Sequence, residues 1–267
     1  MSSKRYSLIE VAEEFDIDFE TIKSTIVLED NDNKTLSSDE FLSEENYGLL
    51  ESHFASNLAE RRIRNCIDSK SSYLNLSNCA LNNDDFLRDG ILHDLFKQCS
   101  HLETLILSAR YLDYDEDYLV ESPNRLAENF FYEIPEPILF CKNLKKLILS
   151  GYANNAYRLW TIKDVNSLSN LQSLTYLDVS GNEIENIEVL NKLKDLNTIV
   201  LSDNQLKKVS ALSNLSNLKS LYLSNNHLED LDGLQYLKSL RHLELSGNII
   251  GTNSGNTKHP ISWNKKY

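Results

Sequence analysis

The sequence contains little of what most catalytic and cofactor sites are built from. Its 267 residues include 8 glycines, 4 prolines and 4 cysteines. None of the motifs GxxxxGK(S/T), GxGxxG, HExxH or GxSxG occurs, so neither a phosphate-binding loop nor a common hydrolase motif is present. The histidines follow no metal-ligand spacing, and the cysteines form no CxxC pair. We therefore expect no catalytic residues, no cofactor and no metal ion.

Long apolar runs are also absent. No stretch of 18 apolar residues occurs, and the first 20 residues place acidic side chains where a secretory signal needs an apolar segment. The cysteines, at positions 66, 79, 99 and 141, suggest no disulfide framework. These features predict a cytoplasmic protein with no membrane partner, or one delivered by a non-classical secretion route.

Negative charge is concentrated at the front of the chain. The net charge is −13. Residues 1–60 contain 15 Asp and Glu against 4 Lys and Arg, whereas residues 61–267 contain 25 against 23. A strongly acidic segment repels phosphate backbones and favours basic partners. We expect a protein partner, possibly a basic one, and no nucleic acid; the oligomeric state stays open.

A 22-residue repeat is the main feature of the second half. The frame LxxLxLxxNxL begins at positions 174, 196, 218 and 240, with small apolar exchanges. The alternation in LxL predicts a short strand, and stacked copies predict a parallel sheet. The Asn follows the strand, where its amide can satisfy backbone groups that would destabilise the fold by about 1 to 3 kcal/mol each if left unpaired. The expected structural ladder is Asn182, Asn204, Asn226 and Asn248.

The frame resembles the consensus of leucine-rich repeats, in particular the 22-residue class of bacterial internalins and of a phosphatase regulatory subunit. The resemblance covers residues 60–250. It implies an α/β solenoid with a curved parallel sheet on its concave face. It also implies a non-catalytic function in protein recognition.

Degenerate copies of the frame occur upstream, at 73–81, 102–112 and 144–152. There the Asn column reads Cys79, Arg110 and Tyr152. The longer gaps predict convex helices at 84–98 and 124–141. Seven strands are therefore expected, with centres at Leu76, Leu107, Leu149, Val179, Leu201, Leu223 and Leu245.

Four regions follow from these patterns. Residues 1–55 form an acidic helical segment and linker, which resembles a helix-turn-helix but offers only Lys23 in its second helix for phosphate contact. Residues 56–72 form an N-terminal capping helix, with Ile63, Cys66 and Ile67 on one face. Residues 73–250 form the solenoid, and residues 251–267 form a thin C-terminal cap.

The partner-binding surface is expected on the concave side of the strands. Ile106, Ile148, Tyr176, Val200 and Tyr222 should form an exposed apolar and aromatic band, and such bands at interfaces commonly have polar rims. A serine column beside them is expected to be structural. The complete set of expected partner-binding residues is Tyr73, Ile106, Lys146, Ile148, Tyr176, Asp178, Val200, Tyr222, His242 and Glu244.

An acidic loop at 111–124 is the second candidate surface. It contains three tyrosines, five carboxylates and no basic residue. Either it contacts a cationic partner or it is a solvated insertion. Its candidate residues are Tyr111, Asp113, Tyr114, Asp115, Glu116, Asp117 and Tyr118.

Three functions remain open. The first is a recognition scaffold, possibly an inhibitor or immunity-type protein that masks a basic toxin or nuclease. The second is a bacterial effector or adaptor whose acidic front docks a second partner. The third is an enzyme that uses Cys66, because Cys66, Ile67 and Asp68 match the CxD motif of ubiquitin ligases with leucine-rich repeats.

Overall fold

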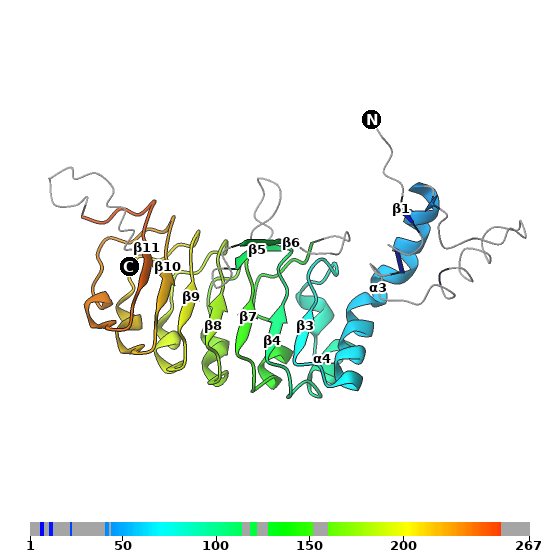
Figure 1. The fold of residues 1–267 in the computed structure, drawn as a ribbon, viewed down its shortest axis with the longest axis horizontal. Helices are drawn as coiled ribbons and strands as arrows, with labels where there is room; N and C mark the ends of the chain where they lie inside the picture. The colour runs from blue at the N-terminus through cyan, green and yellow to red at the C-terminus, as the bar shows by residue number, and fades with distance from the viewer. Residues whose placement is uncertain are drawn as a thin grey trace, which may run out of the picture.

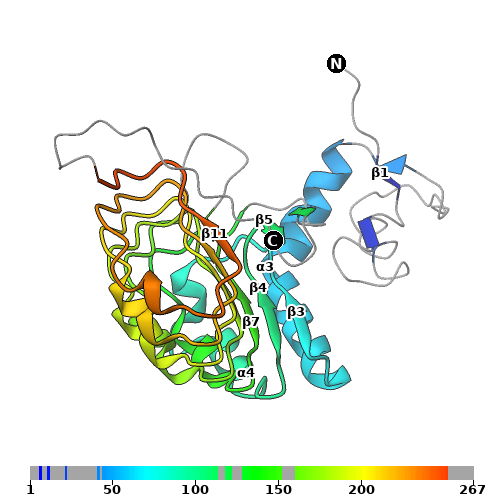
Figure 2. The same cartoon turned by 60° about the vertical axis from the view of Figure 1, so that its left-hand side comes forward.

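The computed structural model describes residues 6–7, 11–12, 22, 41–42, 44–113, 118–121, 128–151 and 160–251. The chain winds into successive coils, and each coil contributes one strand to a continuous sheet (Figure 1). Figure 2 shows the strands on one wall of the solenoid and the short helices on the other. The solenoid with a parallel sheet that the repeats predict is confirmed.

The sheet has seven parallel strands in the order β3, β4, β7, β8, β9, β10 and β11. Each strand has three residues and ends one residue before the expected centre, because pairing covers the first half of each LxL frame. We number the coils 1 to 7 by these strands. They are Tyr73–Asn75, Thr104–Ile106, Lys146–Ile148, Tyr176–Asp178, Thr198–Val200, Ser220–Tyr222 and His242–Glu244.

The asparagine ladder forms as predicted. In coil 5, the Asn204 Nδ2 donates to the Leu201 carbonyl of its own coil and to the Val179 carbonyl of the coil before, each at 3.0 Å. Its Oδ1 accepts from the Ile184 amide at 2.9 Å. Asn182, Asn226 and Asn248 repeat these contacts. Each side chain therefore joins two coils through buried backbone groups.

The ladder also extends into coil 2, through Asn129. Its Nδ2 donates to the carbonyls of Leu76 and Leu107, both at 2.8 Å, and its Oδ1 accepts from the amides of Cys79 and Leu81. Asn129 follows Leu107 by 22 residues, whereas Asn182 follows Val179 by three, so 19 residues are inserted. The prediction that Arg110 holds this position is therefore wrong.

Coil 3 contains a second insertion at the same point. The amide of Ile162 donates to Asn182, as the amide of Ile184 does to Asn204, so Trp160 occupies the asparagine position and not Tyr152. Trp160 follows Leu149 by 11 residues instead of three, so eight residues are inserted. Without the insertions, coils 2 and 3 have 23 and 22 residues, close to the regular repeat. The buried indole donates to the Asn129 carbonyl at 2.8 Å.

The inserted segments, and not long convex helices, account for these two gaps. Residues 110–121 of the first insertion contain an antiparallel hairpin, β5 (Arg110–Asp113) and β6 (Tyr118–Glu121). The helix expected at 84–98 is two short helices, and within 128–141 the expected helix is one 3-10 turn. The convex elements are η1 (Asn83–Phe86), α4 (Ile91–Phe96), η2 (Glu136–Phe140), η3 (Asn166–Asn170), η4 (Glu188–Lys192), η5 (Ser210–Asn214) and η6 (Leu234–Tyr236).

Three of the cysteines are core residues. Cys141 ends η2 at the position where Leu171 ends η3 and Leu193 ends η4, and Cys99 precedes its strand by the same number of residues. Cys66 is buried at the capping helix. All four thiols are free. Burial raises the pKa of Cys79 to about 11 and that of Cys99 to about 12.

A long helix covers the first strand. Helix α3 (Glu44–Ser69) includes most of the range expected for a cap and begins twelve residues before it. Ile63 and Cys66 are buried and Ile67 is half-buried, as the predicted face requires. The guanidinium of Arg62 donates to the Asn75 carbonyl of β3 at 3.0 Å. The apolar end of the repeat stack is therefore closed on this side.

The front segment packs back on itself near the start of α3. Strand β1 (Tyr6–Ser7) pairs antiparallel with β2 (Phe41–Leu42). Val11 and Ile22 are helical and buried in the main core. The other positions of the two expected front helices, and the tail after Gly251, lie outside the described residues.

The asparagine contacts predict unequal effects of two alanine substitutions. Asn129→Ala leaves two buried carbonyls and two amides without partners, so we expect the free energy of unfolding to fall by about 3 kcal/mol and Tm to fall by roughly 6 to 12 °C. The control Asn217→Ala removes one exposed hydrogen bond to Lys194 and should stay within about 0.5 kcal/mol of wild type. Thermal melts followed by circular dichroism compare them. Equal Tm values would show that Asn129 is not part of the ladder.

Candidate functional site

The concave face of the sheet is partly filled. Ile106, Ile148, Tyr176 and Val200 form one apolar cluster with Tyr111, and Val120 and Tyr222 pack against it. Ile148 and Val200 are completely buried and Tyr176 is 3% exposed. The prediction that these four strand residues form an exposed band is therefore wrong. Tyr222 remains half-buried at the margin of the cluster.

The hairpin β5–β6 contributes the covering side chains. Tyr111 and Val120 are directly paired in its register, so they point to the same face, and both pack on the cluster. Leu112 and Leu119 pair on the other face, where Leu119 is 50% exposed. Figure 2 shows β5 on the strand side of the solenoid.

The acidic loop expected at 111–124 is therefore largely a hairpin. Tyr111 and Asp113 belong to β5 and Tyr118 belongs to β6, and Tyr111 is 5% exposed. Tyr114, Asp115, Glu116 and Asp117 lie outside the described residues. The apolar pairs on both sides of the acidic run, Tyr111–Leu112 and Leu119–Val120, were the available hairpin signal.

The polar candidates on the strands differ in their exposure. The Asp178 carboxylate is buried and accepts from the Ser180 amide at 2.9 Å and from its hydroxyl at 2.6 Å. The Lys146 Nζ lies 4.4 Å from the centre of the Tyr176 ring, a cation–π contact. Asp178 therefore supports its own turn, whereas Lys146 closes the cluster at its edge.

The ends of the concave face are open. On the first strand Tyr73 is 51% exposed. On the last two strands Tyr222 and Glu244 are half-buried neighbours in register, and His242 is exposed beside Ser220. Of the predicted partner-binding residues, these four are the most accessible. The structure brings three of them together at the C-terminal end.

The serine column is structural, as the sequence indicates. Its members are buried from coil 1 to coil 6. The Ser180 hydroxyl donates to Ser150 at 3.1 Å, and the Ser246 hydroxyl donates to Ser224 at 2.9 Å. These small side chains let neighbouring coils approach each other at the end of each strand.

Cys66 has the environment of a core thiol. It is 4% exposed, and its Sγ donates to the Ser71 carbonyl at 3.2 Å. Burial raises the pKa of the Cys66 thiol. His101 lies nearby, but its Nε2 is 3.9 Å from the sulfur and 3.2 Å from the Cys66 carbonyl. An attacking cysteine needs a lowered pKa, so the site lacks the activation that the enzyme hypothesis requires.

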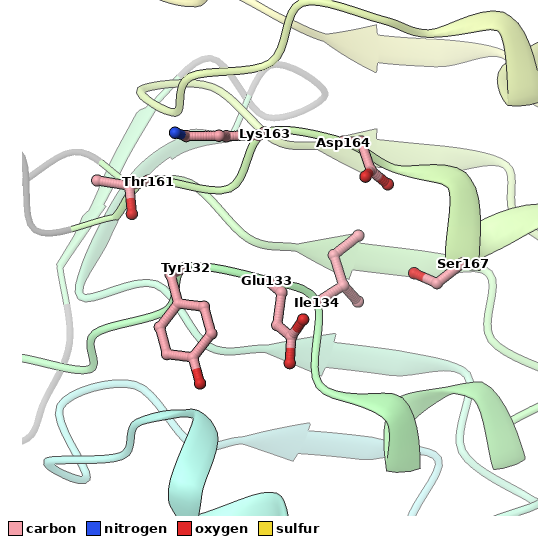
Figure 3. Close-up of a pocket in the computed structure, with 7 residues that line it drawn as sticks. All are labelled: Tyr132, Glu133, Ile134, Thr161, Lys163, Asp164 and Ser167. Atoms are coloured by element: carbon pink, nitrogen blue, oxygen red, sulfur yellow. The ribbon is translucent and has the colours of Figure 1, made fainter.

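A pocket that the sequence did not indicate lies between coils 2 and 3. Twelve residues separate Asn129 from Cys141, whereas eleven separate Trp160 from Leu171, so coil 2 is one residue longer on this side. The pocket has a volume of about 480 Å³. Figure 3 shows its lining residues, which are Tyr132, Glu133, Ile134, Thr161, Lys163, Asp164 and Ser167.

The chemistry of this pocket is mixed. Lys163 extends away from Asp164 in Figure 3, and its Nζ lies 4.0 Å from a Glu183 carboxylate oxygen. Across the described part of the chain, no three His, Cys, Asp or Glu side chains gather as metal ligands. Among the same residues, no helix is both long and apolar enough to cross a membrane. The lining thus offers polar contacts around one aromatic ring.

Comparisons with known proteins agree on the repeats. The family model described as "Leucine Rich repeats (2 copies)" matches residues 172–214 and 216–257. A search of curated proteins finds no match. Among solved structures, internalin C2 from Listeria monocytogenes is similar at 18% identity and a TM-score of 0.47, over 93% of this chain and 91% of that one.

Two plant receptors are also similar. The ectodomain of GASSHO1/SCHENGEN3 from Arabidopsis thaliana, in complex with CASPARIAN STRIP INTEGRITY FACTOR 2, is 20% identical with a TM-score of 0.41. The plant peptide hormone receptor RGFR1, in complex with RGF2, is 23% identical with a TM-score of 0.42. Each match covers 58% of this chain, but only 16% and 22% of the receptor chains. The repeated frames, the stacked coils with their asparagine ladder and the family-model match identify this chain as a leucine-rich repeat protein.

Proposed function

We propose that the protein is a non-catalytic scaffold that binds a protein partner at the C-terminal end of its concave face. The observation that supports this most is the position of Tyr222. Its ring packs against the buried cluster yet remains half-exposed on β10. Such an anchored aromatic loses little conformational entropy on binding, which is typical of interface hot spots.

The surroundings of Tyr222 complete this surface. Glu244 lies directly opposite it on β11, and His242 lies opposite Ser220. A central aromatic with polar neighbours is the usual arrangement of a protein interface. The hairpin fills the middle of the concave face, so a partner on this side meets β10 and β11 first.

Within this proposal, the partner is a basic protein and the function is inhibitory or immunity-type. The support is electrostatic. The chain has a net charge of −13, and the acidic hairpin and Glu244 add carboxylates near the proposed surface. Complementary charge would accelerate association and would make affinity sensitive to salt.

Alanine substitution at two tyrosines tests the location. Tyr222→Ala should weaken capture of the partner by about 30-fold, the effect of losing a hot spot of about 2 kcal/mol. Tyr236→Ala is the matched control, because Tyr236 is 62% exposed on the helical wall, away from the sheet. Titration of immobilised variants with the partner that wild type captures gives both affinities. Equal losses, or none, would contradict the proposed surface.

Salt and charge reversal test the nature of the partner. Reversing Asp113, Asp115, Glu116 and Asp117 to Lys should weaken binding about tenfold or more at low salt, since each exposed pair contributes about 0.2 to 1 kcal/mol. The effect should diminish as salt shortens the Debye length. A control reverses four exposed or half-exposed carboxylates on the helical wall, Glu185, Glu188, Glu229 and Asp232. Binding that is independent of salt would contradict a basic partner and leave the Tyr222 surface intact.

A further inference from the structure

Basic residues gather at the turns that lead into the strands. In coils 3 to 7 each strand is preceded by a short turn, at 142–145, 172–175, 194–197, 216–219 and 238–241. These five turns contain six Lys and Arg but only one acidic residue, Asp195. All six basic side chains are exposed. We call them the basic rim: Lys142, Lys145, Lys194, Lys219, Lys238 and Arg241.

The turns are stacked, so the basic rim is continuous. The Arg241 amide donates to the Lys219 carbonyl at 2.8 Å, and the Lys219 amide donates to the Asn197 carbonyl at 2.8 Å. The same contact continues through Thr175 to Lys145. Lys145 also pairs with Glu103 of coil 2 at 2.7 Å, which marks the end of the excess positive charge.

The opposite edge of the same coils is acidic. The segments after the strands of coils 4 to 6, at 181–190, 203–210 and 225–232, contain seven Asp and Glu against Lys207 and Lys208. The two edges therefore differ in sign although the solenoid is almost neutral overall. A uniformly solvated surface does not require such a separation of charge.

The chain contains a segment of complementary charge. Residues 1–60 carry 15 acidic residues against 4 basic ones. Their attachment places them away from the rim of the same molecule. Helix α3 has 26 residues and is about 39 Å long at about 1.5 Å per residue. Its C-terminal end leads into β3 on the rim side, whereas its N-terminal end lies at the other side of the solenoid (Figure 1).

The front segment is also folded back at that distant end. Pairing of β1 with β2 brings residues 6–7 next to residues 41–42, immediately before α3 begins. This pairing shortens the reach of the segment. The rim cations nearest the C-terminal end, Lys219, Lys238 and Arg241, lie in the last two coils, at the end of the sheet opposite α3.

We propose that the basic rim of one molecule binds the acidic segment 1–60 of a second copy. The two surfaces are different, so the contact is heterologous and each molecule in a chain offers one free rim and one free front. Association is head-to-tail and open-ended. It is electrostatic, so it is strong at low salt and is lost as salt screens the charges.

The first test is the mass of the full chain by sedimentation velocity. At ~10 mM salt, where the Debye length is ~30 Å, the average mass should exceed the 30.7 kDa of the monomer, and at ~1 M it should return to that value. Lys194→Glu, Lys219→Glu and Arg241→Glu together should abolish association. The matched control reverses Lys163, Lys207 and Lys208, which are exposed cations outside the rim, and should associate at least as well as wild type.

A charge swap then identifies the two surfaces. A front variant with Glu29→Lys, Asp30→Lys and Asp32→Lys should fail to associate with itself. Mixed with the rim variant it should form complexes of twice the monomer mass and no larger, because each molecule keeps one working surface. Circular dichroism confirms that both variants are folded.

Three outcomes would overturn the proposal. They are a wild-type monomer at ~10 mM salt, equal loss of association in the rim and control variants, and a mixture that forms no pairs. Association that the rim variant loses but the front variant keeps would assign the rim to another anionic surface, and so would also overturn it. None of these results affects the Tyr222 surface, which is measured with a different molecule.

Discussion

The fold depends on one contact, the hydrogen bonds of a buried asparagine amide to the backbones of adjacent coils. A coil of 22 residues has too few internal contacts to be stable alone, and its turn after the strand leaves backbone groups without partners. Asn204 satisfies carbonyls of two coils and an amide at once. Because the same contact recurs in coils 2, 4, 5, 6 and 7, the coils keep a constant stagger and the strands pair in register.

The same constraint determines where the chain varies. Both insertions begin just after a strand and end at the ladder position, at Asn129 and Trp160. The backbone returns there to the path of the regular coil. The first insertion carries the hairpin whose Tyr111 and Val120 pack on the strands. The feature that most alters the concave surface is thus an addition to the repeat and leaves its core unchanged.

The sequence was sufficient for the repeat and insufficient for its surface. Four regular frames predicted the solenoid, and the spacing of Asn182 and Asn204 predicted the ladder. Asn129 escaped because an insertion of variable length removes the fixed spacing by which ladder residues are recognised. Strand periodicity gave the side of the sheet on which Ile148 and Val200 lie. It could not show that side chains distant in the sequence would cover them, since that depends on tertiary contacts.

The departure points of the two insertions have a consequence for how this protein can change. A segment that leaves and re-enters between two ladder contacts adds loop length without shifting any downstream coil, and loop length has a small entropic effect on stability. Whole hairpins can therefore be gained, lost or exchanged at residues 110–128 and 152–159 while the spring beneath them stays the same. The architecture separates a conserved mechanical support from a surface that evolution or a protein engineer can rewrite.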